Sequence, residues 1–157
     1  MNVTKKLIER NITISTMESC TSGLLCSTLT NTDGASSVVI GGYITYCNEQ
    51  KVRCGVPKEI IDTFGVYSLE CAKFMALAAK KNSKSDIAIG VTGSLGNIDV
   101  NNKDSVVGDV YYGIASDDGI FVSKIKLPED ILFKGREEQK KYVVEIVLGK
   151  LENKILR

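Results

Sequence analysis

The chain has 157 residues, of which 43% are hydrophobic and 25% are charged, which is the size and composition of one ordinary globular domain. Lysine and arginine together number 20 and aspartate and glutamate 19, so the chain lacks the overall basic field that drives nucleic-acid binding. Histidine is absent, which excludes Ser-His-Asp and Cys-His catalysis and the usual imidazole-based zinc sites.

The beginning of the chain reads as helix, strand and helix in turn. Hydrophobic residues at helical spacing among charges predict a helix over residues 2–10, and the alternating β-branched stretch Ile12–Thr16 predicts a strand. A second helix is predicted from Leu24, directly after the hydroxyl-rich segment Glu18–Gly23. Residues 31–37 have the composition of a loop.

The middle of the chain combines one apolar run with several helices. The run Val38–Tyr46 predicts an inner strand, and its two adjacent glycines indicate a bulge or close packing. Short helices are predicted over Asn48–Arg53 and Lys58–Phe64, and Ser68 is expected to cap a longer helix that runs to Lys81. The buried stripe of this longer helix is predicted to consist of Ala72, Met75, Ala76 and Ala79.

The last part of the chain supplies the remaining strands and a long helix. Ile87–Val91 predicts an apolar strand that ends at Thr92-Gly93, and Val106–Ala115 with Ile120–Ile125 predicts a hairpin around a tight turn. Arg136–Leu156 predicts an amphipathic helix. Helices that alternate with buried strands predict an α/β fold: a three-layer α/β/α sandwich around a mixed, mostly parallel central sheet, in a single domain over residues 1–157.

The cysteines and the apolar runs indicate the compartment. Five cysteines, an odd number without a CxxC pair, favour free thiols over a disulfide framework or a structural zinc site. The longest apolar runs, such as Val38–Ile44, are too short to span a bilayer, and Met1–Arg10 lacks a secretory hydrophobic region. We therefore expect a cytoplasmic protein that binds neither a membrane nor nucleic acid.

Segments rich in hydroxyl groups and glycine indicate where a ligand could bind. In open α/β sheets, ligands bind beyond the carboxyl ends of the strands. Glu18–Gly23 and Thr92–Gly96 follow predicted strands, whereas Gly34–Ser37 precedes one. Ser19 and Thr21 could cradle a phosphate together with backbone amides, but hydroxyl groups at a helix start more often cap the helix, and the pattern alone favours capping.

Ser36 and Lys51 are the candidate catalytic pair. Without histidine, a general base must be Lys, Tyr, Asp, Glu or Cys, and Tyr46 and Lys51 follow Ser36 across the predicted strand. A desolvated lysine has a pKa shifted toward neutrality and can accept the proton of a serine hydroxyl. The spacing permits this pair without demonstrating it, and a loop serine with a solvated lysine is the plainer alternative.

Two other chemistries are weaker alternatives. Cys20 at a helix start could be a nucleophile with a lowered pKa, but buried free cysteine is the commoner fate, and without a histidine partner it ranks below Ser36. Glu18, Asp33 and Glu49 carry oxygen ligands that suit a hard metal ion. Their irregular spacing matches no known metal-binding loop, so a metal site has little support.

Three segments closely resemble the CinA C-terminal domain family, which is the family of nicotinamide mononucleotide deamidases. They are Thr16–Gly23, Gly34–Ser37 and Tyr46–Lys51. Further short matches follow in the family's order, so the resemblance covers nearly the whole chain and is specific as an ordered set. These further matches are Gly55–Pro57, Gly65–Glu70, Val91–Gly93 and Val107-Gly108.

The resemblance implies an amidohydrolase that deamidates nicotinamide mononucleotide to nicotinate mononucleotide and ammonia. It also implies a small-molecule nucleotide substrate, no metal, no organic cofactor, and a homo-oligomer that is a dimer or larger. Carried onto this chain, the nucleophile falls on Ser36, the base on Lys51 and an assisting hydroxyl on Tyr46. The implied substrate-binding positions are Ser19, Thr21, Thr92, Gly93 and Arg136, and the basic Arg136 is the candidate contact for phosphate.

The chain departs from the family pattern in one stretch. The family usually carries a Gly-Pro-Gly-Gly type loop after Thr-Gly, where this chain has Ser94–Val100, and Ser105-Val106 replaces the usual Lys-Pro. Lost glycines remove backbone freedom, and a lost lysine removes a positive charge that would meet a phosphate. Two alternatives therefore stay open: a nucleotide-binding or regulatory module without turnover, and an amidase for another small amide, such as one lacking the phosphate.

Overall fold

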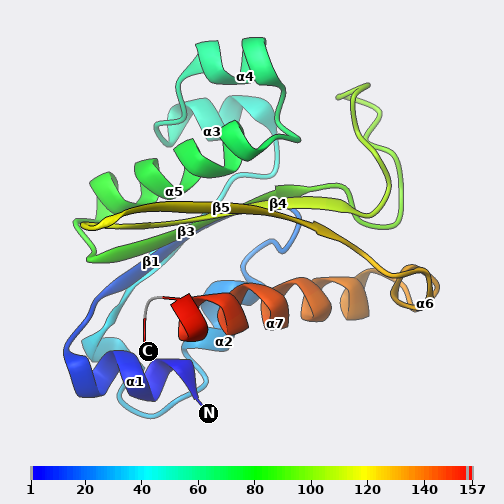
Figure 1. The fold of residues 1–157 in the computed structure, drawn as a ribbon. Helices are drawn as coiled ribbons and strands as arrows, with labels where there is room; N and C mark the ends of the chain where they lie inside the picture. Colours follow the sequence, from blue (N-terminus) through cyan, green and yellow to red (C-terminus); the bar gives the residue numbers. More distant parts are fainter. Residues whose placement is uncertain (1, 155, 157) are drawn as a thin grey trace.

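The computed structural model describes residues 2–154 and 156, which form a sheet covered by helices on both faces (Figure 1). The strands are β1 (Ile14–Glu18), β2 (Val39–Ile44), β3 (Ile87–Gly93), β4 (Asp109–Ser116) and β5 (Gly119–Lys126). One face is covered by α3 (Asn48–Arg53), α4 (Lys58–Phe64) and α5 (Leu69–Ser83). The other carries α1 (Val3–Arg10), α2 (Leu24–Leu29) and α7 (Arg136–Lys154), while η1 (Ala35–Ser37) and α6 (Glu129–Leu132) are short connecting turns.

The sheet has five strands in the order β2-β1-β3-β4-β5. β1 pairs in parallel with β2 and β3, and the pairs β3·β4 and β4·β5 are antiparallel, so that only β4 runs against the other strands. The predicted three-layer α/β sandwich with a mixed, mostly parallel sheet is confirmed. Because Glu18 lies opposite both Ile44 and Val91, the carboxyl ends of β1, β2 and β3 lie side by side at one edge.

β2 lies at the edge of the sheet, so the prediction of an inner strand over Val38–Tyr46 is wrong. Its side chains alternate between half-buried and exposed, and Ile40 and Ile44 are 52% and 54% exposed. The register of β1 against β2 shifts between Ile14 and Ser15, which agrees with the bulge expected from the glycine pair. The apolar composition of the run identified a strand but could not tell an edge position from an inner one.

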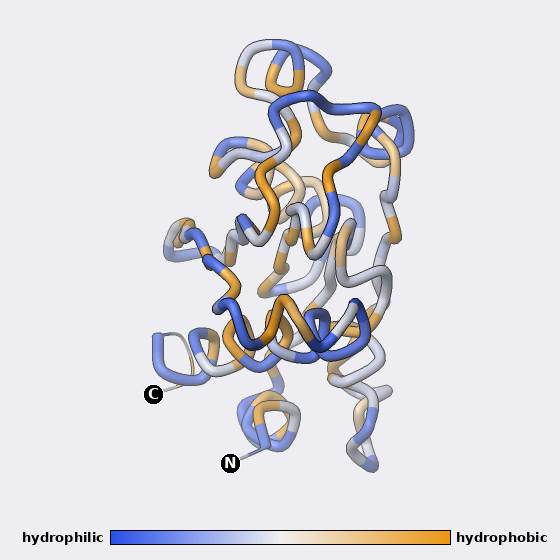
Figure 2. Tube along the Cα trace, turned by 90° about the vertical axis from the view of Figure 1, so that its right-hand side faces the viewer, coloured by the Kyte–Doolittle hydropathy of each residue, from blue (hydrophilic) through white to orange (hydrophobic). Residues whose placement is uncertain are grey.

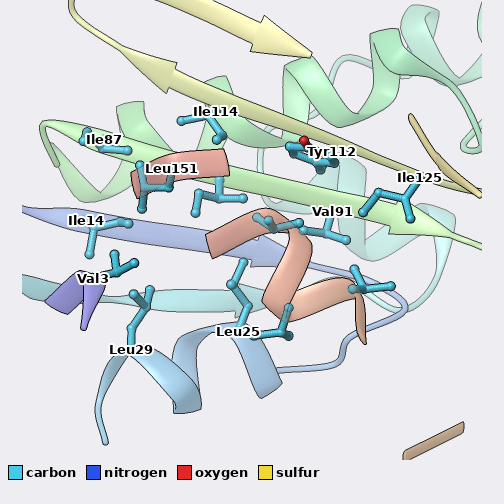
Figure 3. Packing of buried hydrophobic residues seen from close by; sticks show 14 of the residues in the cluster. Val3, Ile14, Leu25, Leu29, Ile87, Val91, Tyr112, Ile114, Ile125 and Leu151 are labelled. Atoms are coloured by element: carbon cyan, nitrogen blue, oxygen red, sulfur yellow. The ribbon is translucent and has the colours of Figure 1, made fainter. Parts of the chain in front are cut away.

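Two hydrophobic clusters join the helices to the sheet. The larger cluster includes Leu25 of α2, Leu151 of α7, Val91 of β3 and Tyr112 of β4, which lie between the sheet and the helices of one face (Figure 3). The smaller cluster lies on the α5 side and includes Met75, which is fully buried. Burying a side chain of this size stabilises the fold by about 1.5 to 3 kcal/mol.

The ends of the helices agree well with the sequence. The Ser68 Oγ atom accepts a hydrogen bond of 3.0 Å from the Cys71 N–H and so caps α5 as expected. The predicted helix over 136–156 is α7, which ends at Lys154, and Ile155 lies outside the described residues. No helix within residues 2–154 is long and apolar enough to cross a membrane.

The segment between β3 and β4, residues 94–108, projects from the sheet beyond the end of β3 (Figure 1). Figure 2 faces the side from which this segment projects and shows hydrophilic and hydrophobic residues mixed along the tube. The hairpin strand predicted from Val106 begins later, at Asp109, because Val106 still belongs to this loop and is 52% exposed. The Gly108 N–H closes the loop by donating to the Ser94 and Leu95 carbonyls, both at 2.9 Å.

Close approach of α5 to the sheet depends on Gly90 of β3. A Cβ atom at Gly90 would lie 2.5 Å from the Ala72 carbonyl oxygen and 2.6 Å from the Ala76 nitrogen. Both contacts are with backbone atoms, which cannot rotate away. The predicted small-residue stripe of α5, confirmed as buried, therefore faces a glycine that lets the helix lie directly on the strand.

We expect Gly90→Ala to lower the free energy of unfolding by roughly 2 kcal/mol or more, because the added methyl group must push α5 away from the sheet. Gly149→Ala is the matched control, since nothing lies within 4 Å of a Cβ atom there and alanine favours the α7 helix. Urea denaturation measures both variants. Equal stability of the two variants would contradict the steric explanation.

Candidate active site

A cavity of about 670 Å³ opens at the edge where β1, β2 and β3 end. This is the position at which open α/β sheets usually bind ligands, because loops and helix starts converge there. Each wall comes from a segment that directly follows a strand or begins a helix. The walls comprise Ser19 and Cys20 after β1, Tyr46–Glu49 after β2, residues of the 93–102 segment after β3, and Arg136 of α7.

Ser19 and Lys51 meet at this cavity. The Lys51 Nζ atom lies 3.3 Å from the Ser19 Oγ atom and 3.0 Å from the Thr45 carbonyl oxygen. Lys51 is 2% exposed and Ser19 is 8% exposed. Ser19 directly follows β1 and Lys51 lies on α3 after β2, so the parallel pairing of the two strands brings the two side chains together.

The surroundings of Lys51 favour the free amine. Burial lowers the pKa of Lys51, and the neighbouring Cys71, Cys47 and Cys20 thiols and Asp99 only partly oppose that effect. The two hydrogen-bond partners of the amine are neutral oxygen atoms. A lysine held in this way is a better proton acceptor near neutral pH than an exposed lysine.

Glu18 organises the turn that carries Ser19. Its side chain is 1% exposed, and its Oε1 atom accepts hydrogen bonds from the Thr21 hydroxyl at 2.6 Å and the Leu25 N–H at 2.8 Å. The Oε2 atom accepts from the Cys26 N–H at 3.0 Å. Because this carboxylate occupies the start of α2, the helix start is not free to hold a phosphate.

Two predicted substrate contacts do not reach the cavity. Thr21 is buried and donates its hydroxyl proton to Glu18, while Thr92 is buried and donates to the Val66 carbonyl oxygen at 2.8 Å. Both hydroxyl groups therefore make hydrogen bonds within the protein, as the capping interpretation of Thr21 suggested. The other predicted substrate contacts, Ser19, Gly93 and Arg136, do line the cavity.

The predicted pairing of Ser36 with Lys51 is wrong, because the two residues lie at opposite ends of β2. Ser36 is exposed in η1, ahead of the strand, and it does not line the cavity. The six residues of β2 separate it from the segment that carries Lys51, and at about 3.3 Å per residue that is roughly 20 Å. A serine that precedes a strand cannot meet a lysine that follows it.

Arg136 connects two walls of the cavity. Its Nη1 atom donates to the Asn97 Oδ1 atom at 2.7 Å, and its Nη2 atom donates to the Tyr46 hydroxyl oxygen at 3.0 Å. Tyr46 is 62% exposed, so its hydroxyl lies at the rim. The hydroxyl oxygen accepts a hydrogen bond from Arg136, and the hydroxyl proton remains available to a ligand.

The sequence interpretation missed a polar network around Asp99. The Tyr67 hydroxyl donates to the Asp99 Oδ2 atom at 2.5 Å, and Asn102 donates to the same atom at 2.7 Å. The Asn48 amide of α3 donates to Asn102 at 2.9 Å, which ties the loop to the helix that carries Lys51. The position of Asp99 after a strand end was the one signal that could have identified it.

Cys20 lines the cavity but is not suited to act as a nucleophile. Burial, with a contribution from the charge of Glu18, raises the pKa of Cys20 to about 12. Its thiol therefore stays protonated at neutral pH. In residues 2–154 and 156, no group of three or more Cys, Asp or Glu side chains is placed to hold a metal ion.

The fold and the cavity define an α/β sandwich protein with a buried serine and lysine pair at the carboxyl edge of its sheet. More specifically, the chain belongs to the CinA C-terminal domain family, whose profile matches residues 1–155. This match confirms the family resemblance found in the sequence.

Relatives and solved structures agree with this membership. A competence-damage inducible protein of Caldicellulosiruptor bescii is 44% identical over 115 residues, 73% of this chain and 28% of that protein. One of Clostridium novyi is 38% identical over 98% of this chain and 36% of its own length, so the chain spans about a third of such relatives. The competence/damage inducible protein of Agrobacterium tumefaciens superposes with a TM-score of 0.82 at 30% identity, covering 95% and 91% of the two chains.

We expect Glu18→Gln to lower the free energy of unfolding by about 2 to 3 kcal/mol, because an amide nitrogen would face N–H and hydroxyl donors that now share a carboxylate. Glu9→Gln, on the exposed side of α1, is the control and should change stability by less than about 0.5 kcal/mol. Chemical denaturation followed by circular dichroism compares them. Similar stability of both variants would show that the turn does not depend on Glu18.

Proposed function

We propose that this chain is an amidohydrolase in which the Lys51 amine activates the Ser19 hydroxyl, and that it deamidates nicotinamide mononucleotide. The observation that carries the proposal is the 3.3 Å contact between the Lys51 Nζ and Ser19 Oγ atoms at the wall of a ligand-sized cavity. Family membership supports it, because Ser19 and Lys51 lie within the segments that resemble the deamidase family.

The reaction begins with proton transfer inside the buried pair. The neutral Lys51 amine accepts the Ser19 proton while the Ser19 Oγ atom attacks the amide carbon of the substrate. The tetrahedral intermediate collapses as the Lys51 ammonium returns the proton to the departing nitrogen, which leaves as ammonia. A water molecule, deprotonated by Lys51, then hydrolyses the ester to give the carboxylate product and to restore Ser19.

The backbone beside Ser19 offers donors for the developing oxyanion. Neither the Cys20 N–H nor the Thr21 N–H donates to another residue in the described part of the chain. The amide that follows a nucleophile commonly stabilises the negative charge of the intermediate, an effect worth about 3 to 4 kcal/mol per donor. The Cys20 N–H is the leading candidate, since it belongs to a residue that lines the cavity.

Arg136 and Tyr46 are assigned to substrate positioning. The guanidinium of Arg136 is bound to neutral partners, so its charge is available to an anionic group of a substrate. Tyr46 lies on the same wall, and its hydroxyl proton can be donated to the substrate. We assign Tyr46 to substrate positioning and not to direct assistance of Lys51, because its hydroxyl group contacts Arg136.

Ser19→Ala and Lys51→Met should each reduce kcat for ammonia release from nicotinamide mononucleotide by at least about a thousandfold, because each removes one half of the reacting pair. Ser36→Ala is the matched control and should retain the wild-type rate, since it lies at the far end of β2. A coupled ammonia assay with purified protein measures all three. Nucleotide binding without ammonia release by the wild-type protein would favour a regulatory module instead.

The rate should depend on pH through the protonation of Lys51. Only the free amine accepts the serine proton, so kcat/KM should rise with pH and level off above the pKa of Lys51, which burial holds below its ordinary 10.5. Lys51→Arg should stay inactive at every pH, because a guanidinium does not deprotonate. A profile from pH 5 to 10 with a saturating coupling enzyme tests this, and a flat profile would exclude lysine as the base.

A further inference from the structure

Carboxylates outnumber cations among the charged side chains that line the cavity. Of the described residues, the charged ones at its walls are Glu49, Asp99 and Arg136. Lys51 lies behind Ser19 and is not among the residues that line the cavity. The lining therefore carries two carboxylates against one cation, although nothing in the overall charge of the chain suggests this.

Asp99 is the more firmly held of the two carboxylates at the cavity. Burial acts to raise the pKa of Asp99, but the hydrogen bonds from Tyr67, Asn102 and the Asn101 N–H outweigh it and leave the pKa lowered. Among the described residues, its Oδ1 atom accepts only the Asn101 N–H, at 2.9 Å, which leaves a lone pair for a ligand. The Asp99 carboxylate is thus charged and held in place, and one of its lone pairs is free to accept a hydrogen bond from a ligand.

The two remaining charges act at the rim. Glu49 is exposed, and hydrogen bonds from its own N–H and from Cys47 lower its pKa, with a further contribution from the charge of Arg53. Arg136 is held between Tyr46 and Asn97, so it offers one positive charge at the mouth of the cavity. A phosphate group carries about −1.5 to −2 charges at pH 7 and would meet this single cation beside a fixed carboxylate.

We infer that this cavity selects a cationic amide without a phosphate, an N-ribosylated pyridinium carboxamide, at least as well as the corresponding phosphate monoester. The inference rests on the proposed amidohydrolase function and concerns its substrate class. Asp99 attracts the positive ring that both compounds carry, and it repels the phosphate that only the nucleotide carries, so the repulsion lowers the preference for the nucleotide. The amides of Asn48 and Asn102, on two neighbouring walls, offer donors and acceptors to the uncharged ribose hydroxyl groups.

The experiment compares kcat/KM for nicotinamide riboside and nicotinamide mononucleotide at low ionic strength. The wild-type value for the riboside should equal or exceed that for the nucleotide. Asp99→Asn should raise the nucleotide-to-riboside ratio by about fivefold, because one charge at close range is removed. Asp118→Asn, an equal change in charge in the turn between β4 and β5 at the opposite end of the sheet, is the control and should alter the ratio by less than twofold.

Glu49→Gln is a second test that does not disturb the Asp99 network, since Glu49 is exposed and holds no loop together. It should raise the ratio in the same direction by a smaller factor, because water screens a charge at the rim. A wild-type ratio above about ten, or a ratio that neither variant raises, would overturn the inference and leave the amidohydrolase standing. Absence of Ser19-dependent ammonia release from both compounds would instead overturn the proposed function, and the substrate inference with it.

Discussion

Burial of the Lys51 amine between two neutral oxygen atoms is the constraint from which the chemistry of the site follows. Because burial lowers the pKa of Lys51 in the folded protein, the unfolded chain binds more protons than the folded one between that lowered pKa and 10.5. Stability contributed by this residue therefore increases as pH rises through that interval. Below that interval the burial of Lys51 costs stability, and the rest of the core must offset it.

Glu18 and Lys51 show two opposite ways of burying an ionisable group within one site. The Glu18 carboxylate is surrounded by donors, and it fixes the turn between β1 and α2. Lys51 has fewer partners, which keeps its lone pair accessible to Ser19. A carboxylate whose oxygen atoms accept several hydrogen bonds fixes the shape of the turn, whereas an amine with fewer partners keeps a lone pair that can react. Glu18 therefore positions Ser19, and Ser19 contacts Lys51.

Much of the fold could be predicted because helices and strands leave a periodic pattern in the sequence, as in the buried stripe of α5. The serine that contacts Lys51 could not be chosen from chain order, since Ser36 is closer to Lys51 in sequence than Ser19 is. The direction of the strands determines which serine lies next to Lys51, because Ser19 follows β1 whereas Ser36 precedes β2. The Asp99 network was missed because its loop has no period, and its contacts join segments far apart in the chain.

Different elements position the Ser19 and Lys51 pair and the 94–108 loop, so the loop can vary while the pair stays in place. Ser19 and Lys51 are placed by the parallel pairing of β1 with β2, which does not involve the 94–108 loop. That loop supplies the wall opposite them, and its turns close on themselves through Gly108. Substitutions in that loop therefore need not move the pair. Hydrogen bonds between Asn48 and Asn102 join the loop to α3, so a change in the loop can reach the helix that carries Lys51 through that contact.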